Sequence, residues 1–332
     1  MNTASNATTH MIRQHNDDGS LQHLVTLEGL DKAQLEHLLA RAQTFVRPLD
    51  APSIRSNALA GVTVANLFGE PSTRTRGSFE LAARRMGAEV INLELHLSSR
   101  SKGETILDTV YTLQAMQIDV LIMRETEVGV PGFVAGHVQP HVSVLSAGEA
   151  HLSHPTQGLL DALTIQQHKG GFEDLTVTIV GDIAHSRVAR SAYHALGILG
   201  VRELRIMAPA WLMPDAHEFA GCRRYESIDA ALEGADVVMM LRIQKERMAG
   251  HIIPEGDEYF RQYGLTPERL RLAKPDAIVM HPGPMNRETE IASAVADGPQ
   301  SVILQQVSNG VAVRMAVLEA VTERVRRMRQ GA

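Results

Sequence analysis

The chain has 332 residues, of which 44% are hydrophobic and 21% charged, with 32 basic against 38 acidic side chains. This length is enough for two ordinary domains, and this composition provides a sizeable core. The formal charge of -6 argues against a nucleic-acid-binding surface and favours a protein of small-molecule metabolism. The single cysteine, Cys222, excludes an intrachain disulfide framework and a thiolate zinc cluster, and it suits a reducing cytoplasm.

The N-terminal segment, residues 1–20, is polar and lacks the apolar centre of a signal peptide. Apolar runs elsewhere fall short of the roughly 18 residues that a transmembrane helix needs, so we expect no contact with a membrane. We interpret residues 1–20 as an extension that is either loosely ordered or used as a docking arm for a partner.

Apolar segments of strand length alternate with amphipathic segments along the first half of the chain. The strand candidates, each with the β-branched residues that pack well in sheets, are 61–68, 88–93, 118–123 and 141–147. Helical patterns lie between them at 73–87, 104–116 and 130–137. A long helical segment at 154–171, which ends in a glycine pair, then leads to a second series.

The second series repeats the same alternation. Its strand candidates are 175–182, 203–208, 235–241 and 276–281, and its helical patterns are 187–199, 214–220, 227–233 and 266–272. Repeated β–α alternation predicts two parallel-sheet α/β domains, at 21–153 and 154–309. The last segment, 310–330, is apolar on one side and basic at its end, and we expect this helix to complete the first domain.

The stretch "EPSTRTRGSF" (70–79) places three hydroxyls and two guanidiniums in five consecutive positions, 72–76, directly after a strand candidate. Pro71 bars helix at the residue before it and Ser72 is a good N-cap, so this cluster falls on the first turn of a helix. Free backbone N–H groups and the positive end of the helix dipole bind phosphate there. The sequence therefore predicts a phosphate site; the alternative is a helix cap with a solvated basic face.

Other common ligand sites find less support. The chain has no G-x-x-x-x-G-K-[ST] phosphate loop and no G-x-G-x-x-G after either strand that ends in glycine, which leaves a nicotinamide cofactor weakly supported. His151 and His154 are close in sequence, as are His137 and His141, but no acidic third ligand accompanies them in a recognisable pattern. We expect neither a metal nor a cofactor.

Motifs in a fixed order from about residue 21 to the C-terminus resemble the aspartate/ornithine carbamoyltransferase family. They are "STRTR" (72–76), "SKGETILDT" (101–109), "MRE" (123–125), "HPTQGLLD" (154–161), "GDIAHSRVARS" (181–191), "RIQKER" (242–247) and "HPGPMNR" (281–287). The last two resemble the aspartate branch, since the ornithine branch typically carries H-C-L-P and an S-M-G loop. Many relatives have leucine at the position of Gly283.

The resemblance implies a reaction in an interdomain cleft. The amine of aspartate attacks the carbonyl carbon of carbamoyl phosphate, a tetrahedral oxyanion forms and phosphate leaves, which requires positioning and charge stabilisation rather than a metal or a nucleophilic side chain. The resemblance places the phosphate on Ser72, Thr73, Arg74 and Thr75. It also places Thr75 at the carbonyl oxygen. No side chain in these motifs is an obvious strong general base, so the proton acceptor stays open, with the leaving phosphate as one candidate.

The same resemblance assigns the rest of the donor site. Arg124 follows a strand and is implied to contact the phosphate and the carbonyl oxygen, which His154 also contacts as a hydrogen-bond donor. Gln157 is implied to bind the carbamoyl amide. Gly283 and Pro284 bring backbone close to the carbamoyl nitrogen.

Arg187, Arg242 and Gln244 are implied to bind aspartate. Two arginines suit two carboxylates and would repel the cation of ornithine, which favours aspartate on physical grounds as well. The alternative for Arg242 is a helix-type ion pair with Glu246.

Lys102 lies in a loop that, in this family, enters the active site of the neighbouring subunit together with a serine four residues earlier. That serine is Ser98, although Ser99 and Ser101 are close alternatives. The resemblance thus implies a homotrimer with shared active sites. It also implies larger assemblies with a regulatory or dihydroorotase-like chain, which residues 1–20 are placed to dock.

Overall fold

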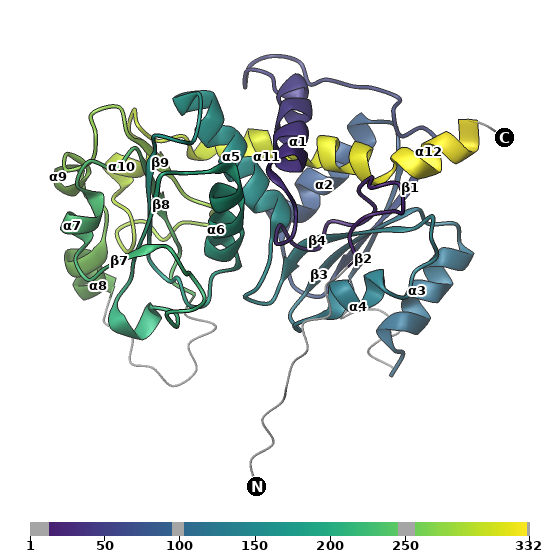
Figure 1. Ribbon diagram of the computed structural model, residues 1–332, viewed down its shortest axis with the longest axis horizontal. Coiled ribbons are helices and arrows are strands. Elements are labelled where there is room, and N and C mark those ends of the chain that lie inside the picture. Colours follow the sequence, from purple (N-terminus) through teal and green to yellow (C-terminus); the bar gives the residue numbers. More distant parts are fainter. Residues whose placement is uncertain (1–12, 95–102, 245–255, 331–332) are drawn as a thin grey trace, which may run out of the picture.

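The structure, a computed structural model, describes residues 13–94, 103–244 and 256–330. Two parallel sheets lie side by side, each flanked by helices (Figure 1). The prediction of two parallel-sheet α/β domains is confirmed. None of the described helices is long and apolar enough to cross a bilayer.

The first domain contains a four-stranded sheet in the order β2-β1-β3-β4, with every strand pair parallel. Its strands are β1 (Thr63–Phe68), β2 (Glu89–Glu94), β3 (Val120–Glu125) and β4 (Ser143–Glu149), and its helices are α1 (Lys32–Phe45), α2 (Thr73–Arg85), α3 (Ile106–Ala115) and α4 (Val130–Ala135). The sequence analysis missed α1, which begins with a capping box in which Asp31 and Gln34 exchange side-chain-to-backbone hydrogen bonds.

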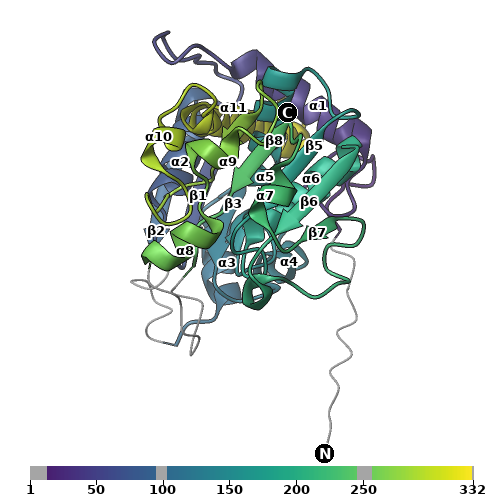
Figure 2. The same ribbon diagram turned by 90° about the vertical axis from the view of Figure 1, so that its left-hand side faces the viewer.

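The second domain contains a five-stranded parallel sheet in the order β7-β6-β5-β8-β9, of which Figure 2 labels the first four strands. Its strands are β5 (Thr176–Val180), β6 (Glu203–Met207), β7 (Arg223–Tyr225), β8 (Val237–Met240) and β9 (Ile278–Met280). The helical elements are α6 (Arg187–Leu199), the short 3-10 helix η3 (Ala210–Leu212), α7 (Ile228–Leu232), α8 (Gly256–Tyr263), α9 (Pro267–Leu270) and α10 (Ser293–Ala296). The eight predicted strands are all present, with ends displaced by up to about two residues.

The helix predicted at 214–220 is wrong, because this segment forms turns after η3. Side chains bind the backbone groups that a helix would have paired. Arg224 donates to the carbonyl oxygens of Pro214 and Asp215 at 2.7 Å each, and the carboxylate of Glu218 accepts from the Asp215 N–H at 3.2 Å.

Two long helices connect the domains. Helix α5 (Pro155–Lys169) and helix α11 (Ile303–Val321) pack against each other, and α11 also packs on α1 and α2 of the first domain (Figure 1). One hydrophobic core cluster is therefore continuous from the first sheet through α5 to the second sheet. The C-terminal helix begins earlier than the predicted residue 310 and is interrupted at Thr322, whose hydroxyl donates to the Leu318 carbonyl at 2.7 Å, before α12 (Glu323–Gln330).

The described part of the N-terminal extension, residues 13–20, packs on the first domain. The Gln14 side chain is buried, and its oxygen accepts from the N–H groups of Val25 and Thr26 at 2.7 and 3.1 Å. Arg324 of α12 donates to the Asn16 side chain at 2.8 Å. The remaining residues of the extension lie outside the described residues, and a docking role for it stays a prediction.

The contact between α5 and α6 depends on a glycine. A Cβ atom on Gly158 of α5 would lie 2.6 Å from the Ser191 carbonyl oxygen of α6 and 2.8 Å from a Leu27 methyl group. Backbone atoms cannot yield as a flexible side chain does, so the two helices touch closely only because no side chain intervenes.

We expect Gly158→Ala to destabilise the fold by about 2–3 kcal/mol, because the added methyl group overpacks the α5–α6 contact. Gly197→Ala in α6 is the matched control, since a Cβ there meets nothing within 4 Å. That change should leave stability unchanged or raise it by up to about 1 kcal/mol. Urea unfolding of both variants measures the effect, and equal midpoints would contradict the prediction.

Candidate active site

A cavity of about 730 Å³ lies between the two domains. It is lined by the start of α2, the end of β3, the starts of α5 and α6, the segments after β8 and β9, and one side of α11. The cavity contains every candidate site residue that falls among the described residues: Ser72, Thr73, Arg74, Thr75, Arg124, His154, Gln157, Arg187, Arg242, Gln244, Gly283 and Pro284. Lys102 and Ser98 lie outside the described residues.

The start of α2 forms one wall of the cavity. Ser72 is the N-cap residue, in extended conformation, and its hydroxyl makes no capping bond. The first intrahelical bond runs from the Arg76 N–H to the Ser72 carbonyl at 3.3 Å, which leaves the amides of residues 73–75 without intrahelical partners. This end of the helix therefore offers donors and a positive dipole to an anion.

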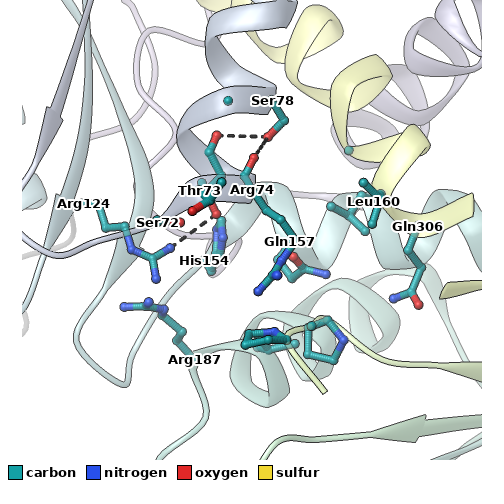
Figure 3. Close-up of a pocket in the computed structure, with 18 of the residues that line it drawn as sticks. Ser72, Thr73, Arg74, Ser78, Arg124, His154, Gln157, Leu160, Arg187 and Gln306 are labelled. Carbon is teal, nitrogen blue, oxygen red and sulfur yellow. Dashed lines mark hydrogen bonds between the residues drawn. The ribbon is translucent and has the colours of Figure 1, made fainter. Parts of the chain in front are cut away.

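The two arginines of the cluster have different surroundings. Arg76 turns away from the cavity and pairs with Glu94 at 2.8 Å. The guanidinium of Arg74 makes no hydrogen bond or ion pair within the described part of the chain, and it lines the cavity (Figure 3). Burial, and then the charge of Arg242, lower the pKa of Arg74, but a guanidinium remains protonated at neutral pH.

Glu70 joins arginines from both domains, and the sequence analysis missed it. Its carboxylate accepts from Arg124 Nε at 2.6 Å and from Arg187 Nη2 through the same oxygen. Arg124 also donates to Thr75 Oγ1 at 3.4 Å (Figure 3). A second bond runs from Arg124 to the Ala147 carbonyl at 3.1 Å. An acidic residue directly before a basic cluster was the available signal, but residues 70 and 71 were interpreted only as a turn.

Gly148, at the end of β4, lets these two arginines approach each other. Its φ is +124°, and a Cβ there would lie 3.0 Å from Arg187 Cζ and 3.3 Å from Arg124 Nη1. A side chain would displace both guanidiniums, so the position requires glycine for conformation and for space. Nothing in the local sequence distinguishes it from an ordinary glycine.

His154 caps the start of α5 and is buried. The backbone N–H of His154 donates to Ser191 Oγ at 2.8 Å, and this hydrogen bond joins α5 to α6. Burial, and then the nearby charges of Arg124, Arg314 and Arg187, hold the pKa of His154 well below its usual range. The imidazole is therefore neutral and carries a single N–H, so it can donate one hydrogen bond but is not a source of protons.

The residues predicted to bind aspartate lie at the start of α6 and after the end of β8. Gln244 donates from Nε2 to the His185 carbonyl at 3.0 Å, and its backbone N–H bonds to Asp182 Oδ2 at 3.3 Å. Arg242 lines the cavity close enough to Arg74 to affect its pKa. Its alternative partner, Glu246, lies outside the described residues.

The charge of the cavity favours anionic ligands. Among the described lining residues, five guanidiniums face one carboxylate: Arg74, Arg124, Arg187, Arg242 and Arg314 against Glu70. Within that same part of the chain, no three histidine, cysteine or acidic side chains converge as metal ligands would. A phosphate and a carboxylate-bearing molecule would each find cationic partners here.

Comparison with known proteins agrees with this geometry. Residues 22–167 match the carbamoyl-phosphate-binding domain of the aspartate/ornithine carbamoyltransferases, and residues 173–321 match their aspartate/ornithine-binding domain. The first match extends through α5, beyond the predicted boundary at residue 153. Both halves of the chain are thus those of a two-domain carbamoyltransferase.

Solved structures from both branches of the family are similar. Aspartate transcarbamoylase from Trypanosoma cruzi in complex with carbamoyl phosphate shares 31% identity and a TM-score of 0.79, over 90% of this chain and 96% of that one. Ornithine carbamoyltransferase from Pyrococcus furiosus shares 26% identity and a TM-score of 0.80, over 92% and 98%. This chain belongs to the aspartate/ornithine carbamoyltransferase family.

We expect the His154 ring to stay neutral in the folded chain from about pH 8 down to well below 6.5. Because the unfolded chain binds this proton below about pH 6.5 and the folded chain does not, His154 reduces stability only as the pH falls below that value. Nitrogen-15 NMR of histidine-labelled protein checks this, with His154→Gln identifying the resonance. A ring that titrates near 6.5 would be evidence against it.

Proposed function

We propose that this chain transfers the carbamoyl group of carbamoyl phosphate to the amino group of L-aspartate. The products are N-carbamoyl-L-aspartate and phosphate, as in the de novo synthesis of pyrimidines, and we expect the reaction to take place in the cytoplasm. The main support is the charge of the cavity, where five guanidiniums face one carboxylate among the described residues. A phosphate dianion and a dicarboxylic amine would balance this charge.

The donor occupies the first-domain side in this proposal. The phosphate binds the N–H groups at the start of α2, with Arg74 as its cationic partner, as expected for an anion at a helix N-terminus. Arg124 Nη1 lies 3.4 Å from Thr75 Oγ1, and in this proposal both side chains contact the phosphate and the carbonyl oxygen. The neutral imidazole of His154 donates to the carbonyl oxygen.

The reaction then needs no nucleophilic side chain. The neutral amine of aspartate forms a bond to the carbonyl carbon, and the oxygen becomes an oxyanion stabilised by His154, Thr75 and Arg124. The bond from carbon to the phosphate oxygen breaks as the carbonyl re-forms. The phosphate, which leaves as an anion next to the amine, takes the amine proton.

The acceptor is selected by charge. Arg187 and Arg242 bind the two carboxylates of aspartate, with Gln244 as a neutral partner. Ornithine would place an ammonium group beside these guanidiniums, which costs binding energy without a compensating anion. A crystal structure of Trypanosoma cruzi aspartate transcarbamoylase holds carbamoyl phosphate and aspartate, and that chain is 30% identical to this one. Ornithine remains the alternative acceptor, since ornithine enzymes have a similar fold.

We expect the purified chain to carbamoylate aspartate at least about 100-fold more efficiently than ornithine, because charge repulsion opposes the second amine. Arg242→Gln should lower kcat/KM for aspartate about 100-fold while changing the KM for carbamoyl phosphate much less. Arg223→Gln is the control, because Arg223 is a largely exposed arginine of the same domain on edge strand β7. Faster carbamoylation of ornithine would refute the assignment.

We further propose that the active chain is a homotrimer with shared sites. In this proposal Lys102 and Ser98 of one subunit act in the cavity of its neighbour, next to the neighbour's Arg74. A regulatory or dihydroorotase-like chain would dock on the N-terminal extension. The support is the sequence resemblance of the segment around residue 102 to the family's lysine loop.

Subunit mixing tests the shared sites. Lys102→Ala and Arg74→Ala chains should each be nearly inactive alone. When equal amounts of the two variants are unfolded and reassembled together, about a quarter of the sites should combine an intact Arg74 with an intact Lys102 from the neighbouring subunit. The mixture should then recover about a quarter of the wild-type activity. Reassembly of each variant by itself is the control. Mixtures as inactive as the separate variants would show that Lys102 and Arg74 act within one subunit.

A further inference from the structure

A chain of buried polar side chains runs beneath the cavity from α5 through α11 to the segment after β9. Asp161 Oδ1 accepts from Gln157 Nε2 at 3.0 Å and from Gln306 Nε2 at 2.8 Å. Gln306 Oε1 accepts from the His281 backbone N–H at 2.9 Å, and His281 Nδ1 accepts from the Gly283 N–H at 2.8 Å. Asp161, Gln306 and His281 are each at most 2% exposed.

Asp161 determines the orientation of the side-chain amides of Gln157 and Gln306. A carboxylate only accepts hydrogen bonds, so the NH₂ groups of Gln157 and Gln306 must both face it. The oxygen of Gln306 is thereby directed to the His281 N–H. The oxygen of Gln157 has no partner among the described residues, and Gln157 lines the cavity beside His154 (Figure 3).

The other end of this hydrogen-bonded network, at His281 and Gly283, also leaves hydrogen-bond acceptors for a ligand. His281 Nδ1 accepts from the Gly283 N–H, so the ring proton is on Nε2, which donates to Glu290 Oε1 at 3.2 Å. That oxygen also accepts from the Asn286 N–H. The Gly283 N–H is thus occupied, and Pro284 has none. The backbone groups of Gly283 and Pro284 that remain available to a ligand are therefore their carbonyl oxygens.

We propose that Asp161 is a positioning residue that makes this side of the cavity accept hydrogen bonds only, and so selects a donor substrate that ends in –NH₂. The inference rests on the proposed donor, carbamoyl phosphate. Its amide carries two N–H groups, which would meet Gln157 Oε1 and a carbonyl of the 283–284 turn. An acyl phosphate with a methyl group at the same place would leave those buried acceptors without donors, which is a costly loss.

The protonation state of Asp161 does not alter this orientation. Burial raises the pKa of Asp161 to about 7, while the hydrogen bonds from both glutamines and the charge of Arg314 oppose that rise. Whether charged or protonated, the carboxyl group retains an oxygen that accepts from both glutamine amides. The position of the hydrogen-bonded oxygen, rather than the charge, orients Gln157.

Two stable phosphonates test the selection without any amine acceptor. Phosphonoacetamide and 2-oxopropylphosphonate differ only in NH₂ against CH₃, and their binding to the full chain is measured by calorimetry together with inorganic phosphate. Wild type should bind the amide at least about tenfold more tightly than the ketone. Asp161→Leu should remove most of this ratio and leave the affinity for phosphate unchanged. Asp161→Asn, which keeps an acceptor oxygen, should retain the ratio within about threefold.

Thr164→Val is the matched control. Thr164 lies on α5 at the same α11 interface, farther along the helix from the site, and its hydroxyl accepts from Asn309 Nδ2 at 2.8 Å. Its removal should reduce stability without changing the ratio. If Thr164→Val changes the ratio as much as Asp161→Leu does, the effect is general loosening of the interface and the proposal is wrong.

The remaining outcomes separate this inference from the proposed function. An unchanged ratio in Asp161→Leu overturns the role of Asp161 alone. If Asp161→Leu does not fold, Gln306→Leu is the variant to test, because it removes the second hydrogen-bond donor to Asp161. It should reduce the amide-to-ketone affinity ratio about threefold, and an unchanged ratio would overturn the inference. A wild-type chain that binds both phosphonates equally refutes the carbamoyl-phosphate site, and the inference with it.

Discussion

Mutual repulsion among buried guanidiniums is the constraint on which the rest of this structure depends. Arg124 from the first domain and Arg187 from the second approach closely enough to need a glycine between them, and both bind one oxygen of Glu70. Positive charges in a part-buried cavity repel strongly unless an anion lies between them. Glu70 supplies one such anion from the chain itself, and substrate anions would supply the others.

The fold places these charges together through the geometry of parallel sheets. Parallel strands end at a common edge, so the ends of β1 and β3 face those of β5, β8 and β9 across the cleft. The first turns of α2, α5 and α6 point into the same space, each with its positive dipole end. Helix α11 crosses both domains and closes the cavity from the side.

Local patterns predicted the elements well where burial and periodicity agree. Helix α6 begins and ends at the predicted residues, and its buried residues recur along one face. Strand β4, which is buried along its whole length, lies two residues from its predicted bounds. The pattern at 214–220 misled because Arg224 and Glu218 bind its backbone. Edge strand β7 has three residues, two of them arginines, and therefore shows little apolar signal.

The sequence by itself determined that a donor-rich helix start follows the first strand and that the chain repeats a β–α alternation, because both are properties of neighbouring residues. Only the tertiary structure decided that Glu70 bridges two domains, that Gly148 must lack a side chain and that Gln306 binds Asp161. These are contacts between residues as many as 145 positions apart, as for Asp161 and Gln306. Hydrogen-bond geometry and charge repulsion act through space, and no local pattern encodes which distant groups will meet.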